Sequence, residues 1–103
     1  MFSLFRSVPS ISTREISAAL TAKTKVIDVR TPSEYREGHI RQAINVPLNK
    51  IANYSGKKEP LYVICQSGAR SKQAAKLLTK MGYDATTIRG GMNQWQGPIQ
   101  GGK

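Results

Sequence analysis

The sequence predicts an α/β fold with a mainly parallel sheet, on three observations. Short apolar runs alternate along the chain with segments of helical spacing, as in β-α-β units. The apolar runs at residues 25–29 and 61–64 are continuous, which is typical of strands buried on both faces. The chain has 103 residues, 39% of them hydrophobic and 21% charged, which suits one compact domain. We therefore expect a single domain over residues 1–103, with helices on both faces of the sheet.

Two capping boxes mark where helices begin. Ser12 and Glu15 have the spacing at which a hydroxyl and a carboxylate satisfy each other's free backbone donors, and Thr31 and Glu34 repeat it. Capping alone accounts for Glu34, so it needs no catalytic role. Gly38 is expected to end the second helix after little more than a turn.

The remaining elements follow from residue type and turn signals. A longer helix after residue 68 has apolar residues at helical spacing and is stopped by Gly82. Short strands are expected at residues 25–29, 43–46, 61–64 and 84–88, and short helices at residues 48–54 and 92–96. Residues 1–9 are expected to form an N-terminal extension, and the glycine-rich residues 97–103 a flexible tail.

The chain is strongly basic, with 16 Lys and Arg residues against 6 Asp and Glu residues and a formal net charge of +10. Such a field attracts nucleic acid, acidic proteins or small anionic substrates, although a solvated basic surface accounts for it equally well. Nucleic acid is the weakest of these, because the aromatic platform of single-strand readers is missing. The apolar runs are too short to span a membrane, and the N-terminus lacks a secretory signal. We therefore expect a cytoplasmic protein with no membrane partner.

The strongest chemical signal lies at residues 65–71, between a predicted strand and the start of a helix. Free N–H groups and the positive end of the helix dipole favour an anion there, and Gly68 lets the loop tighten. The amides of residues 66–70 and the charge of Arg70 would lower the pKa of Cys65 and make it a nucleophile. Cys65 is the only cysteine, so a disulfide or a cysteine-cluster metal site is excluded, and no metal or cofactor is expected. The alternative is that Cys65 is a small buried hydrophobe at the end of a strand.

The size of this loop separates sulfur chemistry from phosphate chemistry. Cysteine-dependent phosphatases place five residues between the cysteine and the arginine, whereas four residues separate Cys65 from Arg70. A smaller ring suits a single sulfur better than a tetrahedral phosphate. A phosphatase or an arsenate reductase therefore ranks third among the candidate functions, and a reductase would also need a second cysteine.

The chain resembles the single-domain rhodanese-like sulfurtransferases over nearly its whole length. The resemblance rests on the Asp-Val-Arg that ends a strand and on further motifs along the chain: residues 34–35, 38–40, 43–47, 65–71, 82–83 and 90–92 with Trp95. The family usually carries glycine two residues after Ile40, where this chain has Gln42.

The resemblance implies a five-stranded parallel sheet flanked by helices, with no cofactor or metal. It also implies a double displacement, in which Cys65 takes sulfur from a small anionic donor such as thiosulfate, becomes a persulfide and passes the sulfur to a thiophilic acceptor such as cyanide or a thiol. The implied substrate-binding residues are Gln66, Ser67, Gly68, Ala69, Arg70 and Ser71. A rhodanese-like module that binds or senses without turnover is the alternative.

Residues around the loop are assigned supporting roles. Asp28 and Arg30 end the strand beside the one that delivers Cys65, and we expect both to act as scaffold, with Arg30 also able to meet an anionic donor. His39 is expected to be a structural imidazole, and Met92 and Trp95 to pack in the core. The helix after the loop also carries a basic stripe formed by Lys72, Lys76 and Lys80. This stripe either is solvated or docks an acidic protein that accepts sulfur.

Overall fold

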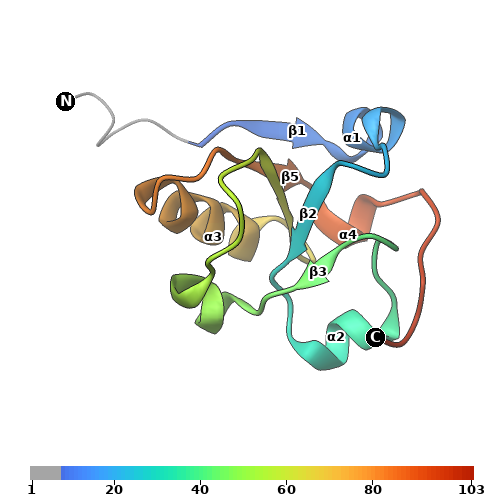
Figure 1. Ribbon diagram of the computed structural model, residues 1–103. Helices are drawn as coiled ribbons and strands as arrows, with labels where there is room; N and C mark the ends of the chain where they lie inside the picture. Colours follow the sequence, from blue (N-terminus) through green and yellow to red (C-terminus); the bar gives the residue numbers. More distant parts are fainter. Residues whose placement is uncertain (1–7) are drawn as a thin grey trace.

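The computed structural model describes residues 8–103 as one α/β unit (Figure 1). The expectations for the N-terminal signal and for most of the extension fall on residues 1–7, outside the described residues. No helix within residues 8–103 has the length and apolar character needed to cross a bilayer.

Five strands form one parallel sheet in the order β1-β5-β4-β2-β3, which confirms the predicted fold class. The strands are β1 (Ser10–Ser12), β2 (Lys25–Asp28), β3 (Ile44–Asn45), β4 (Leu61–Ile64) and β5 (Ala85–Arg89). Four of them lie where the sequence places strands. The fifth, β1, was not located from the sequence: it is three residues long and pairs with β5 at the edge of the sheet.

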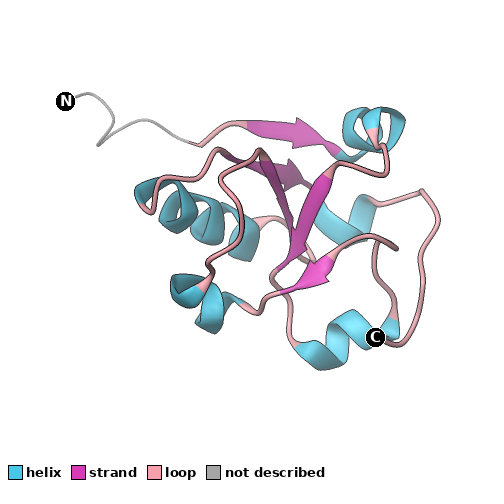
Figure 2. Ribbon diagram, in the orientation of Figure 1, coloured by secondary structure: helices cyan, strands magenta, loops and turns pink. Residues whose placement is uncertain are grey.

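Helices cover both faces of the sheet (Figure 2). They are α1 (Thr13–Ala19), α2 (Pro32–Glu37), the 3₁₀ helix η2 (Leu48–Asn53), α3 (Ala69–Lys80) and α4 (Gly91–Gln94). One buried cluster packs α3 and η2 against the sheet, through Leu78 and Ile51 among others. A second cluster packs Ile16 of α1, with Tyr35 of α2 and Trp95 after α4, against the opposite face.

The central strands supply side chains to both clusters in alternation. Along β2, Val26 joins the α1 side and Ile27 the α3 side, and both are fully buried. Along β4, Val63 joins the α3 side and Ile64 the α1 side. A strand covered on both faces needs apolar residues at consecutive positions, which is why these runs do not alternate in the sequence.

Both predicted capping boxes form. In α1 the Glu15 N–H donates to Ser12 Oγ at 3.0 Å, and the Ser12 N–H donates to Glu15 Oε1 at 3.2 Å. In α2 the Glu34 N–H donates to Thr31 Oγ1 at 3.2 Å and the Thr31 N–H donates to Glu34 Oε1 at 3.0 Å. Each helix therefore starts at the residue that the sequence indicated.

Two local features add contacts that the sequence alone does not specify. The C-terminal tail makes defined contacts: Gln100 and His39 exchange backbone hydrogen bonds of 2.9 and 2.8 Å, and the Gly102 N–H donates to the Arg36 carbonyl at 2.8 Å. In place of the family's glycine, Gln42 donates from Nε2 to the carbonyls of Thr21 and Thr24 and so holds the connection that leads into β2.

Candidate active site

The cysteine loop, residues 65–69, follows the central strand β4 and starts beside the end of the neighbouring strand β2. β2 and β4 are neighbours, with Asp28 aligned to Ile64, and the Val29 N–H donates to the Ile64 carbonyl at 3.0 Å. Cys65 and Arg30 therefore leave the sheet at the same edge, beyond the carboxyl ends of parallel strands, where ligands bind in open α/β sheets.

The Cys65 thiol lies under the loop that precedes α3. The residue is only 1% exposed, yet its sulfur faces a backbone donor, because the Gly68 N–H points at Sγ from 3.0 Å. Gly68 reaches this position with a φ of 115°, a left-handed conformation that residues with a side chain rarely adopt. The burial expected of a structural thiol is thus combined with the polar contact expected of a nucleophile.

The surroundings of the sulfur favour its thiolate form. Burial by itself raises the pKa of Cys65, but hydrogen bonding from the side chain and amide of Ser71 and from the amides of Gly68 and Ser67 outweighs it, so the pKa lies below its ordinary value. The predicted ring of donors is therefore present in part. Gly68 donates a hydrogen bond to the sulfur, and Ser67 and Ser71 contribute to the lowered pKa, whereas no hydrogen bond joins the sulfur to Gln66, Ala69 or Arg70 among the described residues.

A buried hydroxyl pair lies behind the loop. Ser71 Oγ is 2.6 Å from Thr87 Oγ1 on β5 and also donates to the Gly68 carbonyl at 3.1 Å. Both residues are buried. Thr87 on β5 therefore holds Ser71, whose amide and side chain help to lower the pKa of Cys65. No local pattern singles out Thr87, since its spacing is that of any strand residue.

The first turn of α4 orients the loop carbonyls. The Met92 N–H donates to the Cys65 carbonyl at 2.8 Å, and the Asn93 N–H donates to the Gln66 carbonyl at 2.9 Å. This approach requires Gly91, because a Cβ at that position would lie 2.4 Å from the Cys65 carbonyl oxygen. Gly90 and Gly91 both have a positive φ, and the missing side chain of Gly91 allows this backbone contact.

A buried ion pair supports the other side of the loop. Arg30 donates from Nη2 to Asp28 Oδ2 at 2.7 Å and from Nε to Oδ1 at 3.0 Å, with the two side chains 4% and 0% exposed. The same guanidinium donates to Gln66 Oε1 at 3.2 Å and to the Gly38 carbonyl at 2.7 Å. Asp28 also accepts the Arg30 N–H at 3.0 Å, and within residues 8–103 its carboxylate accepts no hydrogen bond from the cysteine loop, which agrees with a scaffold role.

Arg70 has a carboxylate partner on another helix. Its guanidinium donates to both carboxylate oxygens of Glu34, at 2.7 and 3.0 Å, and is not directed at the sulfur. This pairing holds the pKa of Glu34 at about 2, with the hydrogen bond from Arg70 as the largest cause. Glu34 therefore does more than cap α2, and the sequence could not reveal a partner 36 residues away.

The remaining predicted residues occupy structural positions. His39 is fully buried, stacks on the Tyr35 ring with centroids 3.6 Å apart, and lies 2.7 Å from the Tyr35 carbonyl through Nδ1. Trp95 and Met92 pack against the cluster on the α1 side. None of the three contacts Cys65 Sγ through a hydrogen bond in the described part of the chain.

Comparison with known proteins agrees with this geometry. The rhodanese-like domain family matches residues 12–98. A rhodanese-like domain protein from Staphylococcus aureus has a solved structure with a TM-score of 0.85 and 30% identity, over 93% of this chain and 100% of that one. Thiosulfate sulfurtransferase PspE of Escherichia coli is 35% identical over 71 residues, which cover 64% of this chain and 68% of PspE.

A second curated relative is longer than the matched region. The putative sulfur carrier protein YrkF of Bacillus subtilis is 31% identical over 100 residues, which cover 91% of this chain and 54% of YrkF. The chain thus spans about half the length of that relative. The family match extends over most of the chain and includes the whole cysteine loop, so this chain belongs to the rhodanese-like family of sulfurtransferases.

Proposed function

We propose that the protein is a thiosulfate sulfurtransferase that works through a Cys65 persulfide. The Cys65 thiolate attacks the outer sulfur of thiosulfate, the S–S bond of the donor breaks, and sulfite leaves with the bonding electrons. An acceptor such as cyanide then attacks the outer sulfur of the persulfide. The S–S bond between Cys65 Sγ and that outer sulfur breaks, thiocyanate leaves and the Cys65 thiolate is restored.

The observation that carries this proposal is the hydrogen bond from the Gly68 N–H to Cys65 Sγ at 3.0 Å, together with the lowered pKa of the thiol. A thiolate needs no general base, and sulfite is a good leaving group that needs no proton. The same amides can hold negative charge on the terminal sulfur of the persulfide, since they are already oriented before the reaction.

Burial and charge favour a small anionic donor. A thiol on a residue that is 1% exposed accepts only a donor that fits within the loop, and a net charge of +10 draws anions toward the protein. The name of PspE points the same way. We place the protein in the cytoplasm, where a reducing environment keeps a single thiol free.

The direct test is mass spectrometry of the protein after incubation with thiosulfate. We expect Cys65 to gain one sulfur atom, cyanide to remove it, and Cys65→Ser to gain none. Steady release of thiocyanate over many turnovers would distinguish an enzyme from a sensor, which transfers at most one sulfur per chain. Failure to form the adduct with thiosulfate or with an organic persulfide would refute the persulfide mechanism.

A further inference from the structure

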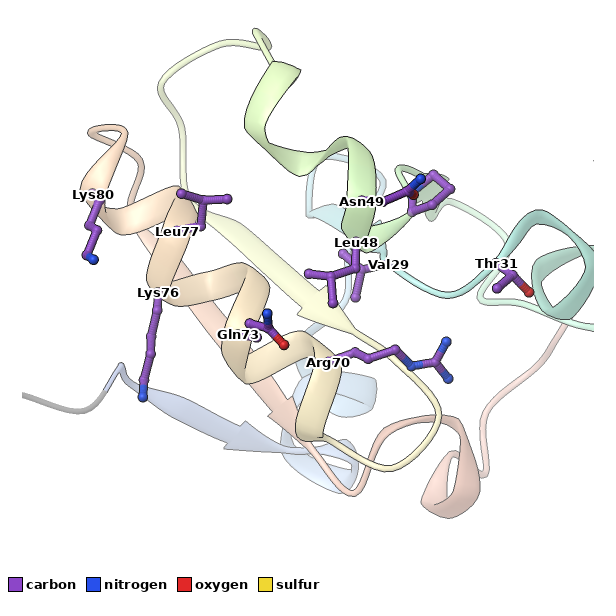
Figure 3. Close-up of a pocket in the computed structure, with 10 residues that line it drawn as sticks. Val29, Thr31, Leu48, Asn49, Arg70, Gln73, Lys76, Leu77 and Lys80 are labelled. Carbon is purple, nitrogen blue, oxygen red and sulfur yellow. The ribbon is translucent and has the colours of Figure 1, made fainter.

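An open groove runs beside the cysteine loop, between η2 and α3 (Figure 3). Its volume is about 750 Å³. The apolar part of its lining comes from the residue after β2, from the start of η2 with the proline before it, and from α3: Val29, Pro47, Leu48 and Leu77. The polar part along α3 includes Arg70 at one end and Lys80 at the other. The groove therefore combines an apolar floor with a basic rim.

One end of the groove lies beside the residues that flank the cysteine loop, residues 65–69. Arg70, in the first turn of α3, directly follows that loop, and the Val29 N–H donates a hydrogen bond to the carbonyl of Ile64, the residue before Cys65. From Arg70 to Lys80 the helix extends for about 15 Å, the length of about five residues of extended chain. The shape thus suits a peptide segment, whereas thiosulfate would occupy only a small part of it.

The charges on the rim are unopposed. Lys76 and Lys80 are exposed, and neither forms an ion pair within residues 8–103. No carboxylate lines the groove, and the nearby Glu34 is already paired with Arg70. The lining also contains no aromatic side chain, which argues against single-stranded nucleic acid, whose bases stack on aromatic rings.

The basic stripe expected from the sequence is divided between two surfaces. Lys76 and Lys80 line the groove, whereas Lys72, one turn nearer the start of α3, lines a separate hollow with Ser67 and Arg89. Lys72 therefore provides a matched control: it has the same charge on the same helix but faces a different surface.

We propose that this groove binds an extended acidic segment of a protein that accepts sulfur. Apolar side chains of the segment lie against Leu48 and Leu77, and its carboxylates lie along Lys76 and Lys80. A thiolate at the end of the segment then attacks the outer sulfur of the Cys65 persulfide, the S–S bond breaks, Cys65 leaves as the thiolate, and the acceptor becomes the persulfide. This step rests on the proposed function, whereas binding of the segment does not.

The first experiment measures binding without sulfur. A fluorescently labelled peptide of six alternating Leu and Glu residues is titrated with the protein and followed by anisotropy. We expect Lys76→Glu combined with Lys80→Glu to weaken binding about tenfold, and Lys72→Glu to leave it nearly unchanged. A peptide with Ser in place of Leu should also bind more weakly, and added salt should reduce binding.

Three results of that experiment would overturn the proposal. The first is no saturable binding of the Leu–Glu peptide. The second is an equal loss of affinity in Lys72→Glu, which would indicate that the peptide is attracted by the overall positive charge of the protein and not by this groove. The third is preferred binding of an oligonucleotide of equal charge, with the same dependence on Lys76 and Lys80, which would assign the groove to nucleic acid. Circular dichroism of each variant checks that the fold is retained.

The second experiment adds the transfer step. A Leu–Glu peptide ending in cysteine is compared with cyanide as the acceptor from the persulfide form. We expect the Lys76 and Lys80 double variant to raise KM for the peptide about tenfold and to leave transfer to cyanide unchanged. An equal loss with both acceptors would contradict docking. If no persulfide forms at all, the proposed function fails, while the binding experiment still shows whether the groove binds an acidic segment.

Discussion

Arg70 and Glu34 form a two-point ion pair that joins the start of α3 to the start of α2. The guanidinium donates to both carboxylate oxygens, at 2.7 and 3.0 Å, and the two side chains are 34% and 31% exposed. The same carboxylate accepts the Thr31 N–H at the beginning of α2. Arg70 therefore links the start of its own helix to α2, and its positive charge also interacts with the negative charge of the Cys65 thiolate.

Glu34→Gln should lower the stability of the protein in a pH-dependent way. Removal of the charge should cost about 1 kcal/mol at pH 7, because the pair is partly exposed. The pKa of Glu34 is depressed from 4.5 to about 2, so its contribution is complete above pH 4.5 and disappears as the pH falls toward 2. Urea unfolding of wild type and variant at pH 7 and pH 3 measures the difference. Glu15→Gln is the control, because it removes the other capping carboxylate, which lies 3.9 Å from Arg89. Its effect on stability should be smaller. A loss of stability in Glu34→Gln that is equal at pH 7 and pH 3 would contradict this account.

Thr87→Val should raise the pKa of Cys65. Valine keeps the shape of the side chain but removes the hydroxyl 2.6 Å from Ser71 Oγ, so Ser71 is held less firmly in the position from which it lowers the pKa of Cys65. The pKa of Cys65 should therefore move upward, toward its ordinary value. The rate of iodoacetamide alkylation against pH reports the thiolate directly. Thr86→Val, at the neighbouring half-buried residue of β5, is the control and should leave the pH profile of alkylation unchanged. An unshifted profile in Thr87→Val would show that Thr87 does not influence Cys65.

Gly91→Ala should damage the loop far more than an ordinary change at a glycine with positive φ. The φ of Gly91 is 56°, and a Cβ there would lie 2.4 Å from the Cys65 carbonyl oxygen and 2.7 Å from that of Gln66. Gly102 also has a positive φ, of 78°, but a Cβ there meets nothing within 4 Å. We expect Gly102→Ala to cost about 1 kcal/mol of backbone strain and Gly91→Ala at least about 3 kcal/mol, with loss of the reaction with thiosulfate.

Thermal unfolding and the rate of persulfide formation measure these two effects separately. Equal melting temperatures for Gly91→Ala and Gly102→Ala would mean that α4 can move away from the loop at little cost. In that case the hydrogen bonds from Met92 and Asn93 to the loop carbonyls would not hold the loop in place.

The features that the sequence predicts correctly are those written in local patterns. The continuous apolar runs of β2 and β4 and the capping box at Ser12 are properties of neighbouring residues, and each element forms where the pattern lies. The placement of Cys65 between a strand and a helix is also local, and the Gly68 contact follows from it.

The features that the sequence does not predict are contacts between distant segments. Ser71 and Thr87 come from different elements, and no periodicity links their side chains before the fold brings them to 2.6 Å. The tail pairs with His39 through backbone groups, which carry no information about residue type. Strand β1, with only three residues of which two are serine, is defined by its partner β5 and not by its own composition.

Arg30→Met should test whether Arg30 acts as scaffold or meets the donor. The guanidinium is 4% exposed and satisfies the buried carboxylate of Asp28, so its removal leaves an unpaired buried charge at a cost of about 3–5 kcal/mol. Adding Asp28→Asn removes that charge, and we expect the double variant to recover at least half of the lost stability, as measured by urea unfolding. If Arg30 is only scaffold, persulfide formation in the double variant should recover together with stability. A double variant that is stable but still reacts slowly with thiosulfate, and normally with iodoacetamide, would instead show that Arg30 meets the anionic donor.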